Sequence, residues 1–284
     1  MKKILISIAV IGSLLSTSAL YAQSTLKLPP LSATQRLSQD FSFSSIDITY
    51  SRPSVRGREV FGDLVQYGKV WRTGANGPTK VKFGEEVDIM GTKIKAGEYV
   101  MYTIPGKTKW EIVFNTGTTP FGPEGYDKSN DVARFNIEST RLPNMVQTFT
   151  IDISDMTYNS CKIDIMWEKT KVSIPIVAHN EEQAGKNIDN AINHASVPYN
   201  QAASYIFESG GDADKAKELV DKAVVQDPKA YYAWYLKARI EMKLGHNKEA
   251  IEAAKKSMEL AAGSALEEEY KHNNQKIIDE LKGK

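Results

Sequence analysis

The chain has 284 residues, of which 41% are hydrophobic and 25% are charged, and its formal net charge is +1. This composition is typical of globular proteins and leaves room for one or two domains. A charge so close to zero weighs against a general binder of nucleic acid or of anionic membrane surfaces, since both need a strong excess of basic residues. The single cysteine, Cys161, excludes an intramolecular disulfide and any metal site built on two cysteines.

Residues 1–22 have the order of a secretory signal peptide. Lys2 and Lys3 precede the apolar run ILISIAVIGSLL, small residues follow, and we expect cleavage near Ala22. The alternative is an uncleaved anchor, but the apolar run is short for a membrane span. We therefore expect an exported protein, periplasmic or secreted, with no membrane span in the mature chain.

The next part of the chain changes from a polar lead-in to a strand pattern. Residues 23–36 contain two prolines and many polar side chains, which predicts an extended lead-in without a core of its own. Across residues 37–178, apolar and polar residues alternate in short runs such as SIDITYS, EYVMYTIPG, KWEIVFNT and CKIDIMWE. This period of two predicts seven to nine half-buried strands, with tight hairpins expected at MGTKIKAG and WEKTKV. Strands without intervening helices predict an antiparallel β-sandwich of the jelly-roll or immunoglobulin-like kind.

Residues 179–284 take a helical period and contain an internal repeat. Gly211 and Gly245 are 34 positions apart, and Ala216 and Ala250 share that spacing. These are the small-residue positions of the tetratricopeptide (TPR) helix pair, where helices approach closely. The alternative is an ordinary helical bundle, which explains the apolar faces but not the shared spacing. We predict a short TPR-like solenoid with a flanking helix on either side, a repeat type that binds protein partners.

The β half offers few residues for chemistry. All four histidines lie at residue 179 or beyond, which weighs against a histidine base or a histidine-ligated metal in the sandwich. The loop GANGPTK lacks the spacing of a phosphate-binding loop, and DKSND lacks the glycine and the distant glutamate of an EF-hand calcium loop. We therefore predict no metal and no cofactor.

One segment of the β half gathers basic and aromatic residues. Its candidate ligand-binding residues are Arg52, Arg58, Trp71, Arg72 and Asn76. The planar fork of arginine suits carboxylate, phosphate or sulfate, and tryptophan suits a sugar face, so the candidate ligand is a carbohydrate or a small anion. The alternative is a structural corner, in which Arg72 pairs with a buried carboxylate and Trp71 fills one end of the core. The direction in which Arg72 points separates the two interpretations.

The segments YSRPSVRGREVFGDLVQYGKVWRTGAN, AGEYVMYTIPG, WEIVFN, DVARFNI and WEKTKVSIPI resemble a family of exported bacterial proteins known as domain of unknown function 2911. The resemblance covers Leu37 to Val177, and it implies that TPR-like helices often follow, as here. The same motifs are hallmarks of that family, which implies a role for the five candidate residues without separating binding from folding. The segment 117–131 departs from the family by being less aromatic.

Three functions follow from these observations. The first is an exported, non-enzymatic binding protein, with a sandwich for a ligand and TPR-like helices for a protein partner. The second is a structural or assembly protein of the cell envelope that uses both halves as interaction surfaces. The third is a carboxylate-based hydrolase, and it has the least support because the β half carries no histidine and no nucleophile motif.

Overall fold

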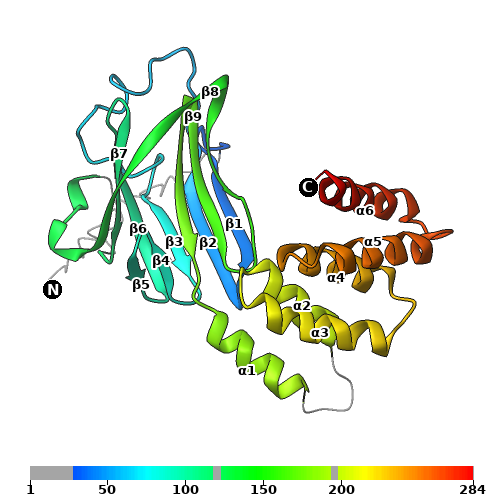
Figure 1. Cartoon of the computed structure of the whole chain (residues 1–284). Coiled ribbons are helices and arrows are strands. Elements are labelled where there is room, and N and C mark those ends of the chain that lie inside the picture. Colours follow the sequence, from blue (N-terminus) through cyan, green and yellow to red (C-terminus); the bar gives the residue numbers. More distant parts are fainter. Residues whose placement is uncertain (1–27, 118–122, 193–197, 284) are drawn as a thin grey trace, which may run out of the picture. The chain divides into compact units, whose positions relative to one another are not determined.

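The structure is a computed structural model that describes residues 28–117, 123–192 and 198–283 (Figure 1). The predicted signal peptide lies outside these residues. Within them, nine strands precede six α-helices. The strands are β1 (Thr34–Phe41), β2 (Ser44–Ser51), β3 (Thr79–Phe83), β4 (Val87–Ile89), β5 (Thr92–Ile94), β6 (Gly97–Ile104), β7 (Lys109–Asn115), β8 (Asp131–Ser154) and β9 (Ser160–Val177). The helices are α1 (Glu181–Ile192), α2 (Tyr199–Glu208), α3 (Ala213–Gln226), α4 (Tyr231–Lys243), α5 (Asn247–Ala261) and α6 (Glu267–Lys282).

The first strand begins at Thr34, inside the stretch 23–36 that we predicted as a lead-in without packing of its own. This strand is an edge strand whose residues alternate between exposed and half-buried, so its hydrophobic signal is weak. It forms because its backbone pairs with β2 from Thr34 opposite Ser51 to Phe41 opposite Ser44. Pairing with a neighbour, and not local pattern, decides this boundary.

All strand pairs are antiparallel, and the strands follow one another in the order β1-β2-β3-β6-β7-β8-β9-β4-β5. The long strand β8 pairs with β7 through its first part and with β9 through its second part, so the sheet folds over on itself. The Tyr50 hydroxyl in β2 donates to the Ile151 carbonyl in β8 at 2.9 Å, which joins the two layers. The predicted antiparallel sandwich is therefore confirmed, as is the helical region that follows it (Figure 1).

Large aromatic side chains fill one end of the sandwich core. Phe61 and Trp110 have ring centroids 4.9 Å apart, and Trp71 stacks on Trp167 at 5.9 Å. Phe149 lies 5.2 Å from Trp71 and closes the cluster. Edge-to-face and stacked pairs of this kind add stability beyond the apolar area that they bury.

The strands β8 and β9 shift register twice, between Arg141 and Val146 and between Val146 and Thr150. Arg141 pairs with Thr170 and Val146 pairs with Glu168, so β8 carries extra residues between these pairs, including Pro143. Proline cannot donate to the strand ladder, and it is typically found at such a bulge. On the facing strand, Glu168 takes a left-handed conformation with φ of 51°. The hairpin that we predicted at WEKTKV is therefore wrong, because the kink at Glu168 bends one continuous strand.

The helical region packs through small residues, as the repeat predicts. Ala216, Ala238 and Ala250 are fully buried, at the positions where the helices of each pair approach. In the turn between α4 and α5, Gly245 takes a left-handed conformation with a φ of 81°. In the turn between α2 and α3, the left-handed residue is Gly210 and not Gly211, the residue that aligns with Gly245. Among the described residues, no helix is long and apolar enough to cross a membrane.

Candidate functional site

The motif GKVWRTGAN forms a tight corner between an isolated β-bridge at Trp71 and the start of β3 at Thr79. Trp71 pairs with Thr103 through two backbone hydrogen bonds, and the Thr79 amide closes the corner on the Arg72 carbonyl at 3.0 Å. Gly74 has a φ of 151°, and a Cβ at this position would lie 2.9 Å from the Ser51 carbonyl oxygen. Only glycine fits such a close approach, so Gly74 is required by the corner itself.

Trp71 points into the aromatic cluster of the core. Its ring contacts Phe149 and Trp167, and its Nε1 donates to the Gly74 carbonyl at 3.0 Å. The polar atom of the indole is therefore satisfied by the turn that follows it. This arrangement favours the structural interpretation of Trp71.

Among the residues that the structure describes, Arg72 forms no ion pair with a buried carboxylate. It is half-buried, and its guanidinium donates to the Asn76 carbonyl at 2.6 Å. Burial raises the pKa of Tyr102, and the nearby charge of Arg72 partly offsets this rise. Asn76 in turn donates to the Ser32 carbonyl at 3.1 Å and to the Ser51 hydroxyl at 3.3 Å. Both side chains therefore hold neighbouring segments of the chain in place.

The other two candidate arginines also bind the backbone. Arg52 donates to the Phe149 carbonyl at 3.0 Å and to the Thr150 hydroxyl at 2.8 Å, across the two layers of the sandwich. Arg58 donates to the carbonyls of Val55 and Ser54. The ligand role of the five candidate residues stays a prediction, and their contacts favour the alternative of a structural corner.

A charged network lies where β7 and β8 pair. Arg134 lies 2.7 Å from Glu111 and 2.7 Å from Asp131, and it also donates to the Tyr126 hydroxyl. Asn115 donates to Asp131 at 2.7 Å. Glu111 and Asp131, two carboxylates of the β half, are thus held by one arginine, as in a structural ion pair. Residues 118–122, part of the segment that departs from the family pattern, lie outside the described residues.

The helical repeats present a band of aromatic rings that crosses α2, α4 and α6. We call it the aromatic band, and it consists of Phe207, Tyr231, Tyr232, Tyr235 and Tyr270. Tyr270 lies 4.7 Å from Tyr231 and 5.5 Å from Tyr235, measured between ring centroids. Tyr232 lies 5.7 Å from Tyr231 and is 45% exposed.

Arg239 extends the aromatic band towards α2. Its guanidinium lies 5.0 Å from the ring centre of Phe207 and 5.7 Å from that of Tyr235, and it pairs with Glu208. The spacing of aromatic residues did not reveal this band in the sequence, because its members come from three helices. Their neighbourhood depends on how the helices pack.

A second feature of the helices is a hollow of about 560 Å³ lined by α3, α4 and α5. Glu241 is only 1% exposed, and its two oxygens contact Lys217 at 3.2 Å and His246 at 2.7 Å. Asp221 nearby binds both Lys217 and Lys237. Burial alone would raise the pKa of Asp221, but the hydrogen bonds from these lysines hold it below its ordinary value. These ion pairs hold α3 against α4.

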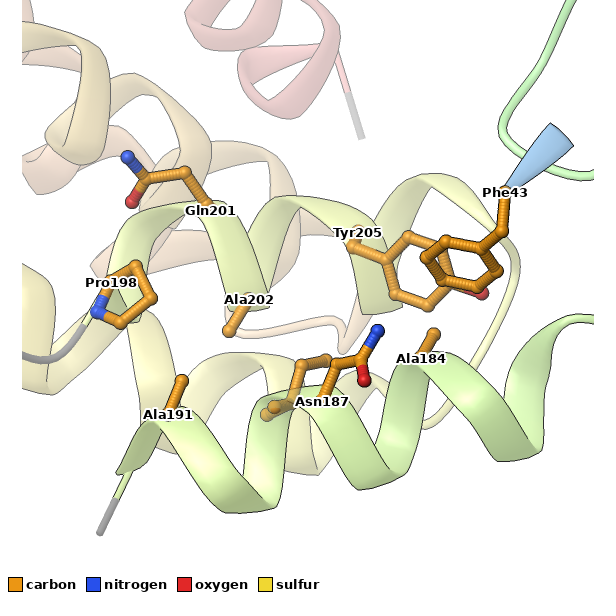
Figure 2. Close-up of a pocket in the computed structure, with 9 residues that line it drawn as sticks. Phe43, Ala184, Asn187, Ala191, Pro198, Gln201, Ala202 and Tyr205 are labelled. Atoms are coloured by element: carbon orange, nitrogen blue, oxygen red, sulfur yellow. The ribbon is translucent and has the colours of Figure 1, made fainter. Parts of the chain in front are cut away.

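A smaller apolar pocket of about 250 Å³ is lined by α1, α2 and Phe43 (Figure 2). Both Phe43 and Tyr205 line this pocket, together with Ala184. The Tyr205 hydroxyl donates to Asn180 at 2.6 Å, and Asn180 donates to the Ser42 hydroxyl at 2.9 Å. Asn180 therefore links α2 to the turn between β1 and β2. Among the described residues, no group of three or more His, Cys, Asp or Glu side chains is placed to hold a metal ion.

Comparison with known families supports both halves of this architecture. A family model described as protein of unknown function (DUF2911) matches residues 32–176. A tetratricopeptide repeat model matches residues 231–263, which contain α4 and α5. A comparison with curated proteins finds no match.

Proposed function

Since the chain belongs to the family of proteins of unknown function DUF2911 and carries a tetratricopeptide repeat, we propose that it is an exported binding protein whose helices hold a protein partner. A repeat of this type indicates protein interaction, because stacked helix pairs present extended surfaces. The aromatic residues of the helices indicate which of these surfaces binds the partner.

The aromatic band is the observation that carries the proposal. Tyrosine, tryptophan and arginine are enriched where protein interfaces derive most of their binding energy, since they bury much area and keep a polar group. The aromatic band combines four tyrosines and a phenylalanine with Arg239. Tyr232 is the most exposed member of the band, which makes it the expected centre of contact.

Site-specific photo-crosslinking in cells that make the protein tests this proposal. Benzoylphenylalanine at position 232 should give a crosslinked product with one partner. The matched control carries the same group at position 225 on α3, where the natural Val225 is 78% exposed. If position 232 gives no product, or gives the same products as position 225, the proposal fails.

A measured affinity then tests the energetic role of the aromatic band. Tyr232→Ala should weaken binding of the identified partner by about tenfold or more, as expected for an interface centre. Tyr232 is exposed, so the substitution should leave the melting temperature of the protein nearly unchanged. An unchanged affinity would exclude the aromatic band from the interface.

Export is the second element of the proposal, and it rests on the charged, apolar and small segments of residues 1–22. Cell fractionation should place the protein in the periplasm or the medium. N-terminal sequencing of the mature protein should begin near Gln23. A full-length protein in the cytoplasm would refute export.

The third element is a ligand for the sandwich, a carbohydrate or a small anion. Its support is the excess of basic residues in the β half between Arg52 and Lys82, where only Glu59 and Asp63 carry negative charge. The polar groups of the corner residues form hydrogen bonds to the backbone of the chain itself, so the proposed ligand site lies elsewhere in the sandwich.

A further inference from the structure

A polar pocket of about 480 Å³ opens where β8 and β9 lose register. Its volume lies within the usual range of small-molecule sites, about 300–1,000 Å³. Four separate segments line it: Tyr67 in the loop before the corner, the β6–β7 turn, the middle of β8 and the middle of β9. The residues that line it are Tyr67, Lys107, Thr108, Ser139, Thr140, Arg141, Met145, Glu168, Lys169 and Thr170.

The backbone at this pocket is irregular on both strands. Glu168 holds a φ of 51°, a conformation that is uncommon for residues other than glycine, and the bulge around Pro143 faces it. Bulges and left-handed residues of this kind are concentrated next to functional sites, where they redirect side chains. The Glu168 carboxylate also accepts a hydrogen bond from the Val60 amide at 2.9 Å. This bond ties the loop that contains the motif REVFG to the wall of the pocket.

Three cations line the pocket without a carboxylate partner. Lys107, Arg141 and Lys169 are exposed, and among the described residues none has an ion pair. By contrast Lys171, two positions further along β9, pairs with Asp164 at 2.7 Å. Among the described residues that line the pocket, Glu168 is the one acidic residue, so the lining carries an excess of positive charge. Cations that lack a partner in the protein attract an anionic ligand.

The remaining polar groups of the lining are hydroxyls. They belong to Tyr67, Thr108, Ser139, Thr140 and Thr170. Tyr67 is 39% exposed, and a Cβ at Gly62 would lie 3.0 Å from its ring, so the glycine makes room for the ring. A ligand that carries only negative charge would use the cations but would be repelled by Glu168. A ligand that also carries hydroxyl groups can donate to that carboxylate and to the hydroxyl oxygens.

We propose that this pocket binds an acidic saccharide, through its carboxylate or sulfate groups at Lys107, Arg141 and Lys169 and through its hydroxyls at Glu168. The inference rests on the proposed ligand role of the sandwich and gives it a site that the corner residues do not form. Arg141 pairs with Thr170 where the strand irregularity begins, and Lys169 is the residue of β9 that lies inside it.

Isothermal titration of the full mature protein tests the site. The probes are trigalacturonate, a sulfated chondroitin disaccharide, the neutral sugar maltotriose and inorganic sulfate. One or both acidic saccharides should bind, and which one binds identifies the anionic group; maltotriose and sulfate should bind at least about tenfold more weakly. Raising the salt concentration from about 50 to about 500 mM should weaken the acidic saccharide, because exposed charges are screened.

Two substitutions in the pocket and one control substitution test which residues contribute to binding. Arg141→Gln and Lys169→Gln should each weaken binding of the acidic saccharide by about tenfold. The matched control is Lys82→Gln on β3, since Lys82 is also exposed and lies outside the pocket lining. All three residues are exposed, so the melting temperatures of the variants should match that of the natural protein.

The outcomes separate this inference from the functions proposed above. If an acidic saccharide binds and neither pocket variant weakens it, the sandwich keeps a ligand role and the pocket assignment fails. If sulfate binds as tightly as the acidic saccharides, the saccharide class is wrong. If none of the probes binds, the inference and the ligand role of the sandwich both fail, while crosslinking at position 232 reports separately on the protein partner.

Discussion

Replacing Trp71 by alanine tests whether the family motif is a structural corner. The substitution removes a ring whose centroid lies 5.2 Å from that of Phe149 and 5.9 Å from that of Trp167. It also removes the hydrogen bond from Nε1 to the Gly74 carbonyl. Truncating a buried tryptophan costs about 3–5 kcal/mol. Trp71 is half-buried, so we expect a loss at the lower end, about 3 kcal/mol including the hydrogen bond.

Unfolding by guanidinium chloride measures this loss. Tryptophan fluorescence reports on the sandwich through Trp110 and Trp167, and a Trp234→Phe background removes the signal of the helices. Circular dichroism at the helix band follows the repeats separately. Trp71→Ala should lower the midpoint of the fluorescence transition, and Trp71→Phe should lower it by about half as much, because phenylalanine keeps part of the ring contact.

A Trp71→Ala variant that unfolds within about 0.5 kcal/mol of the natural protein, the range of substitutions away from the core, would contradict this expectation. Such a result would mean that the ring contributes little to the core. The ligand-facing interpretation of GKVWRTGAN would then regain its support. The next measurement would be whether an added sugar quenches the fluorescence of Trp71.

Further predictions concern three other residues. Arg72→Ala should change the free energy of unfolding by at most about 1 kcal/mol, since the side chain makes one hydrogen bond to an exposed carbonyl; a loss near that of Trp71→Ala would show that it anchors the fold. Burial raises the pKa of Cys161 to about 12, so iodoacetamide at pH 8 should label the thiol only after unfolding, and rapid labelling of the folded protein would contradict its burial. Burial alone would raise the pKa of Asp221, but hydrogen bonds from Lys217 and Lys237 hold it below 3.8. Because the folded-state pKa is the lower one, this stabilisation is present above about pH 4 and is lost as the pH falls through the folded value. Asp221→Asn should therefore remove about 1 kcal/mol of stability at pH 7, and less at pH 2, when helix unfolding is followed by circular dichroism.

The fold class was readable from the sequence because its signals are local. Alternation at period two marks a strand wherever one face is buried, and it marked the runs SIDITYS, EYVMYTIPG and KWEIVFNT, where the structure has β2, β6 and β7. By contrast, β1 has only a weak alternation, and its pairing with β2 determines it. Likewise, the continuous course of β9 through Glu168 depends on β8 beside it, so the local signal at WEKTKV was misleading.

The helical repeat was predictable for a related reason. Close packing of two helices requires small residues at fixed positions, and Ala216 and Ala250 are such residues in both copies. The same spacing says nothing about the outer face of the helices. The aromatic band joins side chains of α2, α4 and α6, and only the packing of those helices brings the rings within contact.

At the candidate site the residue types are readable from the sequence, but their contacts depend on the tertiary fold. The sequence identified Arg52, Arg58, Trp71, Arg72 and Asn76 as special, because their residue types are unusual together in a β half. It could not state their contacts, since Arg52 bonds to Phe149 nearly a hundred positions away and Arg72 bonds to a carbonyl four positions away. The polar pocket was invisible for the same reason, because its cations come from a turn and two strands that are distant in the chain. Local pattern determines which elements form, and the long-range pairing of those elements determines which side chains remain free to bind a ligand.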